Sequence, residues 1–441
     1  MSRPSFWHAG IEPMREFFGQ YFSRAVFVAL AVVSTLALSA KVSLAWRTFG
    51  TNDVLTFQQD AAKLEKSGWQ ALYRDGVQSF AADGRPFKEI QVFSHPPAML
   101  HGLRLLKALA RISGLPLGFW MRFLCALADL GSLLVILLLA ISNRQLVIKP
   151  AAVLLLAASP ISLFVSGFHG NTDSIMMFFV VLAVFFADGL LSTCEKWAPY
   201  LAGACIGLAL DIKLVPAIFV PAVFFYFKSW KNRALFSGAF MFVALVSSMP
   251  FVWQNPTLVA SKLFGYSGQA RVWGWSVMLV AIEDSSWSWI ARLYSDYGKF
   301  AVLAMVGLLG WAMNATPRRL PLFAQCGLIA FFFLFFAPGF GVQYLSWLVP
   351  WTVFAGTLAT AIYSLTGGAF LYLVYAHWSG SYIWDYANSF ERAGWSRLGF
   401  FCGLLCWVCV GIILLWFGDI WLKRAVGPAR DRPVRPESLV A

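Results

Sequence analysis

The sequence predicts an all-α polytopic membrane protein with about 12 transmembrane helices. Its 441 residues are 59% hydrophobic and only 12% charged, with a mean hydropathy of +0.68, whereas soluble domains carry about 25% charged residues. Residues 320–384, a stretch of 65, contain no Asp, Glu, Lys or Arg. Because one helical span needs about 20 apolar residues, that stretch alone crosses a bilayer about three times.

The net charge of +13 has a topological origin. Most of the excess Lys and Arg lies in short loops and at both ends, the pattern of cytoplasmic loops in membrane proteins. We therefore expect a multi-pass membrane protein with both termini cytoplasmic, and no nucleic-acid partner. The seven cysteines lie in apolar segments except Cys194, so we expect no disulfides. Cys402, Cys406 and Cys409 share a helix face without a nearby His and are expected to pack rather than bind metal.

The first element follows a cytoplasmic N-terminus, residues 1–24. Residues 25–46 form an apolar run in which Ala37 and Ser39 resemble a signal-peptide cleavage site. Because further spans follow and Lys41 can snorkel outward, we expect an uncleaved first span instead.

An outer loop, residues 47–112, comes next. Its first part, residues 47–97, has mixed charge. Residues 98–112 place Arg104, Lys107 and Arg111 on one helical face, which predicts an amphipathic helix at the membrane interface.

Basic inner loops set the direction of the later spans. Two short segments within 199–227 have to go out and return, so their junction at Asp211-Ile212-Lys213 lies at the outer side. The turn near Gly367 is placed by length alone. The other expected spans are 117–142, 150–167, 174–191, 234–253, 298–314, 320–337, 345–362, 366–384 and 398–420, before a basic cytoplasmic tail at 421–441.

This threading puts the unusual polar clusters on one side, the outer side. Ionisable groups at membrane depth are functional candidates by default. The clusters contain Asp53, His95, the segment HGNTDS at 169–174, Lys213, Arg271 and Gln343.

Each cluster has a structural and a functional interpretation. Asp53 belongs to a turn or helix cap, or is a carboxylate that accepts a proton from a sugar hydroxyl. His95 opens a rigid Pro-Pro helix start, or also lines a pocket. In HGNTDS, Asn171 or Thr172 caps the next helix, while Asp173 suits hydroxyl recognition or pairing with a cation.

The basic residues allow the same two interpretations. Arg122 and Asp129 lie seven residues apart on one helix face, so they neutralise costly charges, with each other or with other partners, or Arg122 faces a phosphate. Lys213 pairs with Asp211 or grips a lipid-linked phosphate. Arg271 anchors to lipid headgroups or joins the site.

The segment around Gln343 and Tyr344 is an outer turn that enters an aromatic helix. An interfacial aromatic belt accounts for Tyr344 and Trp347, but it does not account for Gln343. The sequence contains no P-loop, Rossmann fingerprint, HExxH or serine-hydrolase elbow. It also has no Asp-x-Asp, so we expect no metal.

Six motifs, taken in order, resemble the GT-C superfamily of membrane glycosyltransferases that use polyprenyl-phosphate sugars, and most closely its mannosyl- and glucosyltransferase-like members. They read TNDVLTFQQDAAK, SHPPAML, MRFLCALAD, GFHGNTDSIM, GLALDIKLVPAIFVP and FAPGFGVQYLSWLVPW. Residues 25–255 resemble the more constant GT-C module, and residues 256–420 resemble the variable half.

The resemblance implies roles for particular residues. Asp53 matches the catalytic acidic residue of the first outer loop, and Lys213 lies in the segment associated with the lipid carrier. Phosphate binding is expected from Lys213, Arg122 and Arg271. Sugar or acceptor binding is expected from the following residues: His95, His169, Asn171, Asp173, Gln343 and Tyr344.

The implied function is transfer of a hexose, mannose before glucose, from a polyprenyl-phosphate donor to a glycolipid or cell-envelope glycan. The resemblance places this reaction on the extracytoplasmic side of the cell inner (plasma) membrane. The lipid-linked sugar is a co-substrate, and no cofactor is expected. A secondary transporter or lipid flippase is the alternative, since broken helices and intramembrane charges suit transport equally. The outer placement of the charges and the lack of an internal repeat argue against it. A third interpretation is a non-catalytic assembly subunit, which would not depend on Asp53.

Overall fold

The computed structural model describes residues 23–80, 86–143, 145–189, 196–265, 272–280, 282–283, 285–380 and 386–426. The α-helices are α2 (Arg24–Arg47), α3 (Asn52–Asp75), α4 (Met99–Ser113), α5 (Leu117–Ser142), α6 (Pro150–Ala157), α7 (Pro160–Ser162), α8 (Asp173–Val184), α9 (Ala198–Ile212), α10 (Val220–Tyr226), α11 (Trp230–Val246), α12 (Met249–Gln254), α13 (Pro256–Gly265), α14 (Gly274–Val280), α15 (Ser288–Ala315), α16 (Leu322–Phe336), α17 (Thr352–Ala355), α18 (Thr357–Ser379) and α19 (Arg397–Val426). The π-helical segments are η1 (Leu163–His169) and η2 (Phe185–Gly189), and the 3₁₀ segments are η3 (Val215–Phe219), η4 (Val342–Trp347) and η5 (Val349–Trp351). The short strands are β1 (Gly50–Thr51), β2 (Val77–Phe80), β3 (Pro86–Gln91) and β4 (Tyr386–Ala387).

Long apolar helices form a single bundle, which confirms the predicted all-α polytopic membrane class. Six helical segments among the described residues are long and apolar enough to span a bilayer, namely α2, α5, residues Pro150–His169, α15, α18 and α19. Three shorter apolar helices accompany them, Ala198–Ile212, Val215–Tyr226 and Leu322–Phe336. The total of about 12 spans and the module boundary at residue 255 stay predictions.

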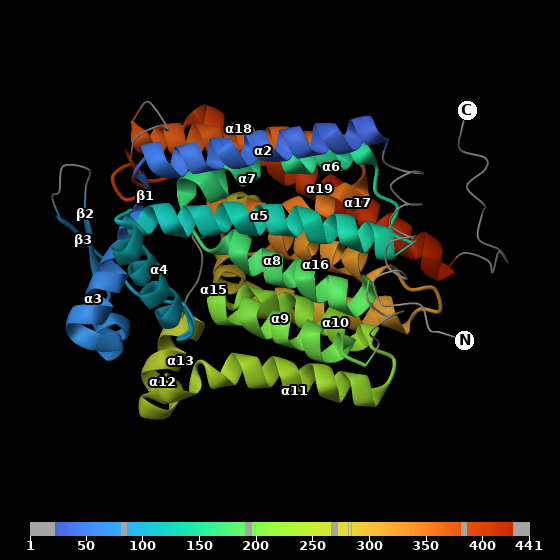
Figure 1. Cartoon of the computed structure of the whole chain (residues 1–441), viewed down its shortest axis with the longest axis horizontal. Helices are drawn as coiled ribbons and strands as arrows, with labels where there is room; N and C mark the ends of the chain where they lie inside the picture. Colours follow the sequence, from blue (N-terminus) through green and yellow to red (C-terminus); the bar gives the residue numbers. More distant parts are fainter. Residues whose placement is uncertain are drawn as a thin grey trace.

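Both ends of the described chain lie at the same end of the bundle. Figure 1 shows that α2 begins, and α19 finishes, on the side opposite α3 and α4. The described chain therefore passes between the two ends of the bundle an even number of times. This arrangement agrees with both termini on one side, and the assignment of that side to the cytoplasm stays a prediction.

One predicted turn is wrong. The chain reverses at Gly356, where φ is 95°, rather than near Gly367. Gly367 lies inside α18, where a Cβ would come within 2.5 Å of Ile161 Cδ1. The reason is the 3₁₀ geometry of residues 342–351, which rises about 2.0 Å per residue rather than 1.5 Å. Fewer residues therefore cover the distance that the length argument assigned to a full α-helix.

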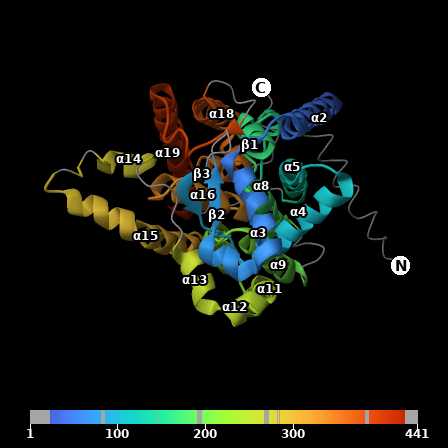
Figure 2. The same cartoon turned by 90° about the vertical axis from the view of Figure 1, so that its left-hand side faces the viewer.

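A small cap covers the end of the bundle opposite the described termini. Figure 2 views this end directly, with α3 across it, the β2–β3 hairpin and α4 beside it, and α12 and α13 below. The predicted amphipathic helix is α4, but its apolar face packs on α3. Leu100 and Leu103 are fully buried in a cluster with Phe57 of α3. One face of α4 thus contacts protein, and the predicted position of this helix at the membrane interface stays a prediction.

The segment before α19 is joined to the segment before α3. Strands β1 and β4 pair in parallel, with Gly50 opposite Tyr386 and Thr51 opposite Ala387. Next to them, Asn52 Oδ1 accepts hydrogen bonds of 3.2 Å from the backbone N–H and the hydroxyl of Ser389. These contacts bring the segment before α19 over the start of α3.

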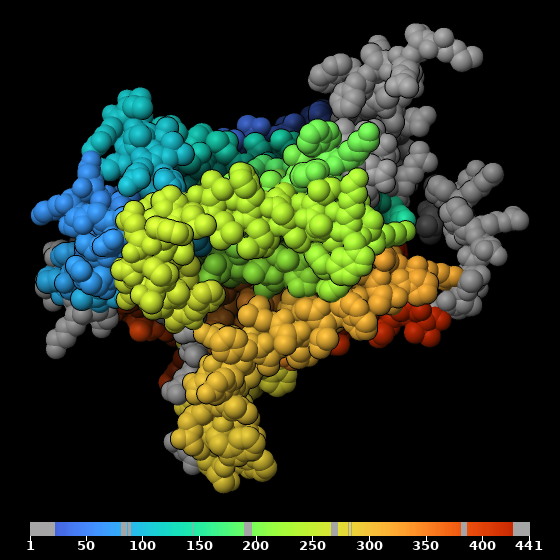
Figure 3. All heavy atoms as spheres, turned by 90° about the horizontal axis from the view of Figure 1, so that it is seen from below, coloured from blue at the N-terminus to red at the C-terminus, as the bar shows by residue number. Residues whose placement is uncertain are grey.

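An arm made by α14 and the first turns of α15 projects from the bundle (Figures 2 and 3). Its large apolar side chains are exposed, among them Trp289, Leu293, Tyr297 and Phe300. Such a surface is expected where a helix faces lipid.

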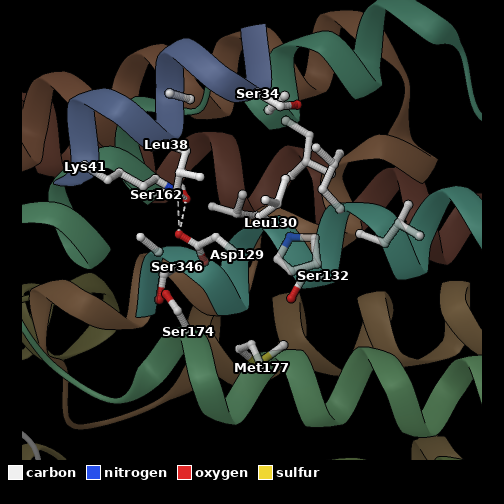
Figure 4. A pocket seen from close by; sticks show the side chains of 18 residues that line it. Ser34, Leu38, Lys41, Asp129, Leu130, Ser132, Ser162, Ser174, Met177 and Ser346 are labelled. Atoms are coloured by element: carbon white, nitrogen blue, oxygen red, sulfur yellow. Dashed lines mark hydrogen bonds and ion pairs between the residues drawn. The ribbon is translucent and has the colours of Figure 1, made fainter. Parts of the chain in front are cut away.

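A buried polar cluster links α2, α5, α7 and η1 within the bundle (Figure 4). Lys41 Nζ lies 2.6 Å from Asp129 Oδ2 and donates to the Ser162 hydroxyl at 2.6 Å. The hydroxyls of Ser162 and Ser166 also donate to Asp129. The expected outward snorkelling of Lys41 is therefore wrong, because a carboxylate within reach neutralises the ammonium group at membrane depth.

We expect Lys41→Met to lower the free energy of unfolding by about 3–5 kcal/mol, because it leaves a buried carboxylate without its cation. Thermal unfolding in detergent measures the effect. The double variant Lys41→Met/Asp129→Asn should recover much of the loss. Lys423→Met is the control, since its partner Asp419 is exposed and such pairs contribute about 0–1 kcal/mol. A wild-type melting curve for Lys41→Met would contradict this role.

Candidate functional site

The HGNTDS segment is a tight turn pressed against the start of α3. Segment η1 ends at His169, and Gly170 has a φ of 75°, a conformation that favours glycine. A Cβ on Gly170 would lie 2.3 Å from Val54 Cγ2. On the other side, the Thr51 hydroxyl donates to the His169 carbonyl at 2.7 Å. The turn and the first residues of α3 are thus held in direct contact.

Asp53 sits in the first turn of α3 and faces this segment. Its Oδ2 accepts hydrogen bonds from Asn171 Nδ2 at 2.7 Å and from His169 Nε2 at 3.1 Å. Its side chain remains 30% exposed. Burial on its own would raise the pKa of Asp53, but His169, Asn171 and Lys213 together hold that pKa below its ordinary value. Asp53 is therefore ionised at neutral pH.

His169 is held between Asp53 and a tyrosine of a distant helix. The Tyr375 hydroxyl lies 3.1 Å from His169 Nδ1. Because an ionised carboxylate only accepts hydrogen bonds, His169 Nε2 carries a proton and donates it to the hydrogen bond with Asp53. Tyr375 was not predicted, since a tyrosine inside an apolar run gives the same signal as a packing residue.

Lys213 stands at a break between two short helices, as predicted. Helix α9 ends at Ile212, and Lys213 is extended, with φ −151° and ψ 151°. Its Nζ donates to Asp173 Oδ2 at 2.7 Å, whereas Asp211, the expected partner, accepts from Ser247 at 2.7 Å. Residues that are neighbours along the chain face different helices here.

Asp173 is fully buried behind Lys213. Its second oxygen accepts from the Trp347 indole N–H at 2.6 Å. The predicted pairing of Asp173 with a cation is therefore confirmed. Asp173 does not border the open cavity, so we leave it out as a direct sugar ligand.

These groups border a cavity of about 350 Å³ at the end of the bundle opposite the described termini. Seven of the predicted site residues line it, namely Asp53, His95, His169, Asn171, Lys213, Gln343 and Tyr344. The motifs from the first outer loop, HGNTDS, the α9–η3 break and the GVQYLSW segment thus meet at one place. Arg271 lies outside the described residues.

Arg122 does not line the cavity, and its hydrogen bonds serve the packing of the bundle. Its guanidinium donates to the carbonyls of Gly118, Ala45 and Thr48 and to the Thr48 hydroxyl, at 2.9–3.0 Å. Two of these carbonyls end helix α2, where a cation is favourable. We therefore leave Arg122 out of the proposed phosphate site.

His95 contributes a neutral ring to the cavity wall. Burial lowers its pKa to about 4. Its Nδ1 lies 3.2 Å from the Ile212 carbonyl, so Nδ1 carries the proton. The Tyr73 hydroxyl fixes the His95 backbone by donating to its carbonyl at 2.6 Å.

Part of the cavity wall was not predicted. Trp378, Ser389, Phe390 and Trp395, from the end of α18 and the loop before α19, also line the cavity. Asp60 of α3 is a further unpredicted wall residue. Within the described ranges, no three His, Cys, Asp or Glu side chains gather as metal ligands. Cys194 lies outside those ranges.

The comparisons with known proteins bear on this site. The comparison with curated proteins found no similar chain. Among solved structures, the chain is similar to ArnT from Cupriavidus metallidurans, a structure with undecaprenyl phosphate bound. The two share 15% identity over 92% of this chain and 78% of that chain, with a TM-score of 0.49.

Residues 93–338 match the sequence family described as Glycosyltransferase family 87. This range contains most of the site: His95, His169, Asn171 and Lys213. The match confirms the resemblance found in the motifs, and it favours an enzyme over a transporter or an assembly subunit. The chain therefore belongs to glycosyltransferase family 87 and is a membrane glycosyltransferase.

Proposed function

We propose that the protein transfers a hexose, mannose in preference to glucose, from a polyprenyl-phosphate donor to a glycolipid or cell-envelope glycan. The site faces the extracytoplasmic side of the cell inner membrane. One observation carries the proposal: an ionised carboxylate, Asp53, and an ammonium group, Lys213, border the same cavity. These are the two groups that direct displacement of a phosphate from a sugar requires.

In this reaction the acceptor hydroxyl oxygen forms a bond to the anomeric carbon while the bond from that carbon to the phosphate oxygen breaks. Asp53 takes the hydroxyl proton as general base. Its Oδ1 is the more available oxygen, because it accepts only one long hydrogen bond, 3.4 Å from Asn52 Nδ2, whereas Oδ2 accepts from both His169 and Asn171. The departing polyprenyl phosphate takes the bonding electrons, and Lys213 stabilises its negative charge.

The wall beside Lys213 suits a lipid-linked donor. The next two residues of the chain, Leu214 and Val215, are apolar and line the cavity, as do Leu263, Phe340 and Val342. A phosphate at Lys213 thus has a hydrophobic surface next to it for the first isoprene units, and the polar groups of α3 are left for the acceptor.

Sugar transfer by the purified full-length protein tests the proposal. The protein is placed in nanodiscs with radiolabelled polyprenyl-phosphate mannose or glucose and a lipid extract, and label in a new product is counted. We expect transfer from the lipid-linked donor and none from a nucleotide-linked mannose. Transfer from the nucleotide sugar alone would contradict the proposed donor.

A further inference from the structure

Asp60 is a second carboxyl group in the cavity wall. It lies seven residues after Asp53 and thus on the same face of α3. Its side chain is nearly completely buried, at 2% exposure, and it borders the cavity. Its Oδ1 has no hydrogen-bond partner in the part of the chain that the structure describes. Buried polar atoms are normally satisfied, so this oxygen indicates a ligand.

Three basic groups near Asp60 have other partners. On its own helix, Lys63 donates to the Gly76 carbonyl. On the packed helix α4, Lys107 and Arg111 bind Glu65. Asp53, His95 and Lys213 border the same cavity, and Lys262 lies on α13, which also packs on α3.

Asp60 is consequently a neutral acid near pH 7. Burial raises its pKa to about 8, although Lys63 acts in the opposite direction. A protonated carboxyl group carries one hydrogen-bond donor and one free acceptor, whereas a carboxylate only accepts. A sugar hydroxyl also donates and accepts, so the protonated group and a hydroxyl match each other.

We propose that Asp60 is a specificity-determining residue that binds a hydroxyl group of the acceptor through its protonated carboxyl group. The proposal rests on the proposed function, because it assigns Asp60 to the molecule whose reacting hydroxyl sits at Asp53. The apolar lining and Lys213 receive the donor, and α3 therefore presents its two carboxyl groups to the acceptor.

The spacing of the two groups gives the chemical class of that acceptor. Seven residues of α-helix rise about 10 Å. An acceptor that reaches both Asp53 and Asp60 carries hydroxyl groups far apart, as a glycan or polyol headgroup does and a simple alcohol does not. An acceptor without the second hydroxyl leaves the buried carboxyl group of Asp60 without a hydrogen-bond partner. The site therefore discriminates strongly against such an acceptor.

The test compares Asp60→Asn and Asp60→Leu in the transfer assay, with polyprenyl-phosphate mannose and increasing amounts of lipid extract. Asp75→Asn is the control, because Asp75 is an exposed aspartate at the end of the same helix. We expect Asp60→Leu to raise the apparent KM for the extract about 10–100-fold with a much smaller change in kcat. The amide of Asp60→Asn keeps a donor and an acceptor, so its KM should stay near that of the wild type.

The pH profile separates this role from a purely structural one. In the wild type, the apparent KM should rise as the pH passes about 8, where Asp60 loses its proton. Asp60→Asn should not show this rise. An unchanged KM in Asp60→Leu, or an alkaline rise that persists in Asp60→Asn, overturns the proposal. If Asp60→Leu does not fold, the dependence of KM on pH in Asp60→Asn is sufficient to test the proposal.

Thermal melting gives a readout that needs no transfer. Because the folded state raises the pKa of Asp60, it is expected to lose stability relative to the unfolded state as pH rises from about 4 to about 8. The melting temperature of Asp60→Asn should therefore exceed that of the wild type more at pH 9 than at pH 5. An equal difference at both pH values means that Asp60 is not protonated in the folded protein, which overturns the inference even where transfer is active. If the wild type melts as expected but transfers no sugar, the proposed function is wrong. The acceptor role of Asp60 then fails with it.

Discussion

Asp53→Asn is expected to reduce sugar transfer by about 10²–10⁴-fold, the usual contribution of a positioned general base. The amide keeps the size of the carboxyl group, and its oxygen still accepts from Asn171 or His169, so the site geometry is preserved. What is lost is the negative charge that receives the acceptor proton. Counting label in the product at saturating donor measures the loss.

The pKa of Asp53 sharpens this expectation. Because it lies below its ordinary value, Asp53 is ionised throughout pH 5–8, and the loss in Asp53→Asn should be equally large at every pH in that range. Asp75→Asn is again the matched control on α3, and both variants should melt like the wild type. Transfer by Asp53→Asn within a few-fold of the wild type would remove Asp53 as the base while leaving the family assignment intact.

The bounds of a span could be predicted where a long apolar run was the dominant signal. Residues 117–142 form α5 with the predicted bounds, because a long apolar run between charged ends permits one placement only. The turn near Gly367 failed because length alone cannot distinguish 3₁₀ from α geometry. The sequence also predicted that Asp53, His169 and Lys213 lie at the same end of the bundle, since the basic loops set the direction of each span. They line one cavity, and the assignment of that end to the outer side stays a prediction.

The partners of these residues could not be predicted. Lys213 binds Asp173, 40 residues away, and His169 meets Tyr375, 206 residues away. Pairs like these depend on which helices pack side by side, and hydropathy does not encode that. The same limit applies to Arg122, whose carbonyl partners at the end of α2 give no sequence signal, and to Ser389, whose loop closes the cavity.

Lys213→Met is expected to reduce transfer by about 10²–10³-fold, the typical loss when one group that stabilises developing negative charge is removed. A loss of transfer in Lys213→Met would have two explanations. Lys213 stabilises the leaving phosphate, or it only neutralises Asp173, which is fully buried and has Trp347 as its other partner. Leaving such a carboxylate unpaired destabilises the fold by about 3–5 kcal/mol, so activity would also fall in the second case.

The double variant Lys213→Met/Asp173→Asn separates the two explanations. The amide at position 173 needs no cation and can still accept from Trp347, so the double variant should melt closer to the wild type than Lys213→Met does. If Lys213 only neutralises Asp173, transfer recovers together with the melting temperature. If its ammonium group faces the phosphate, stability recovers and transfer does not, because no other Lys or Arg among the described residues lines the cavity. We expect the second result, since Lys213 borders the open cavity while Asp173 lies behind it.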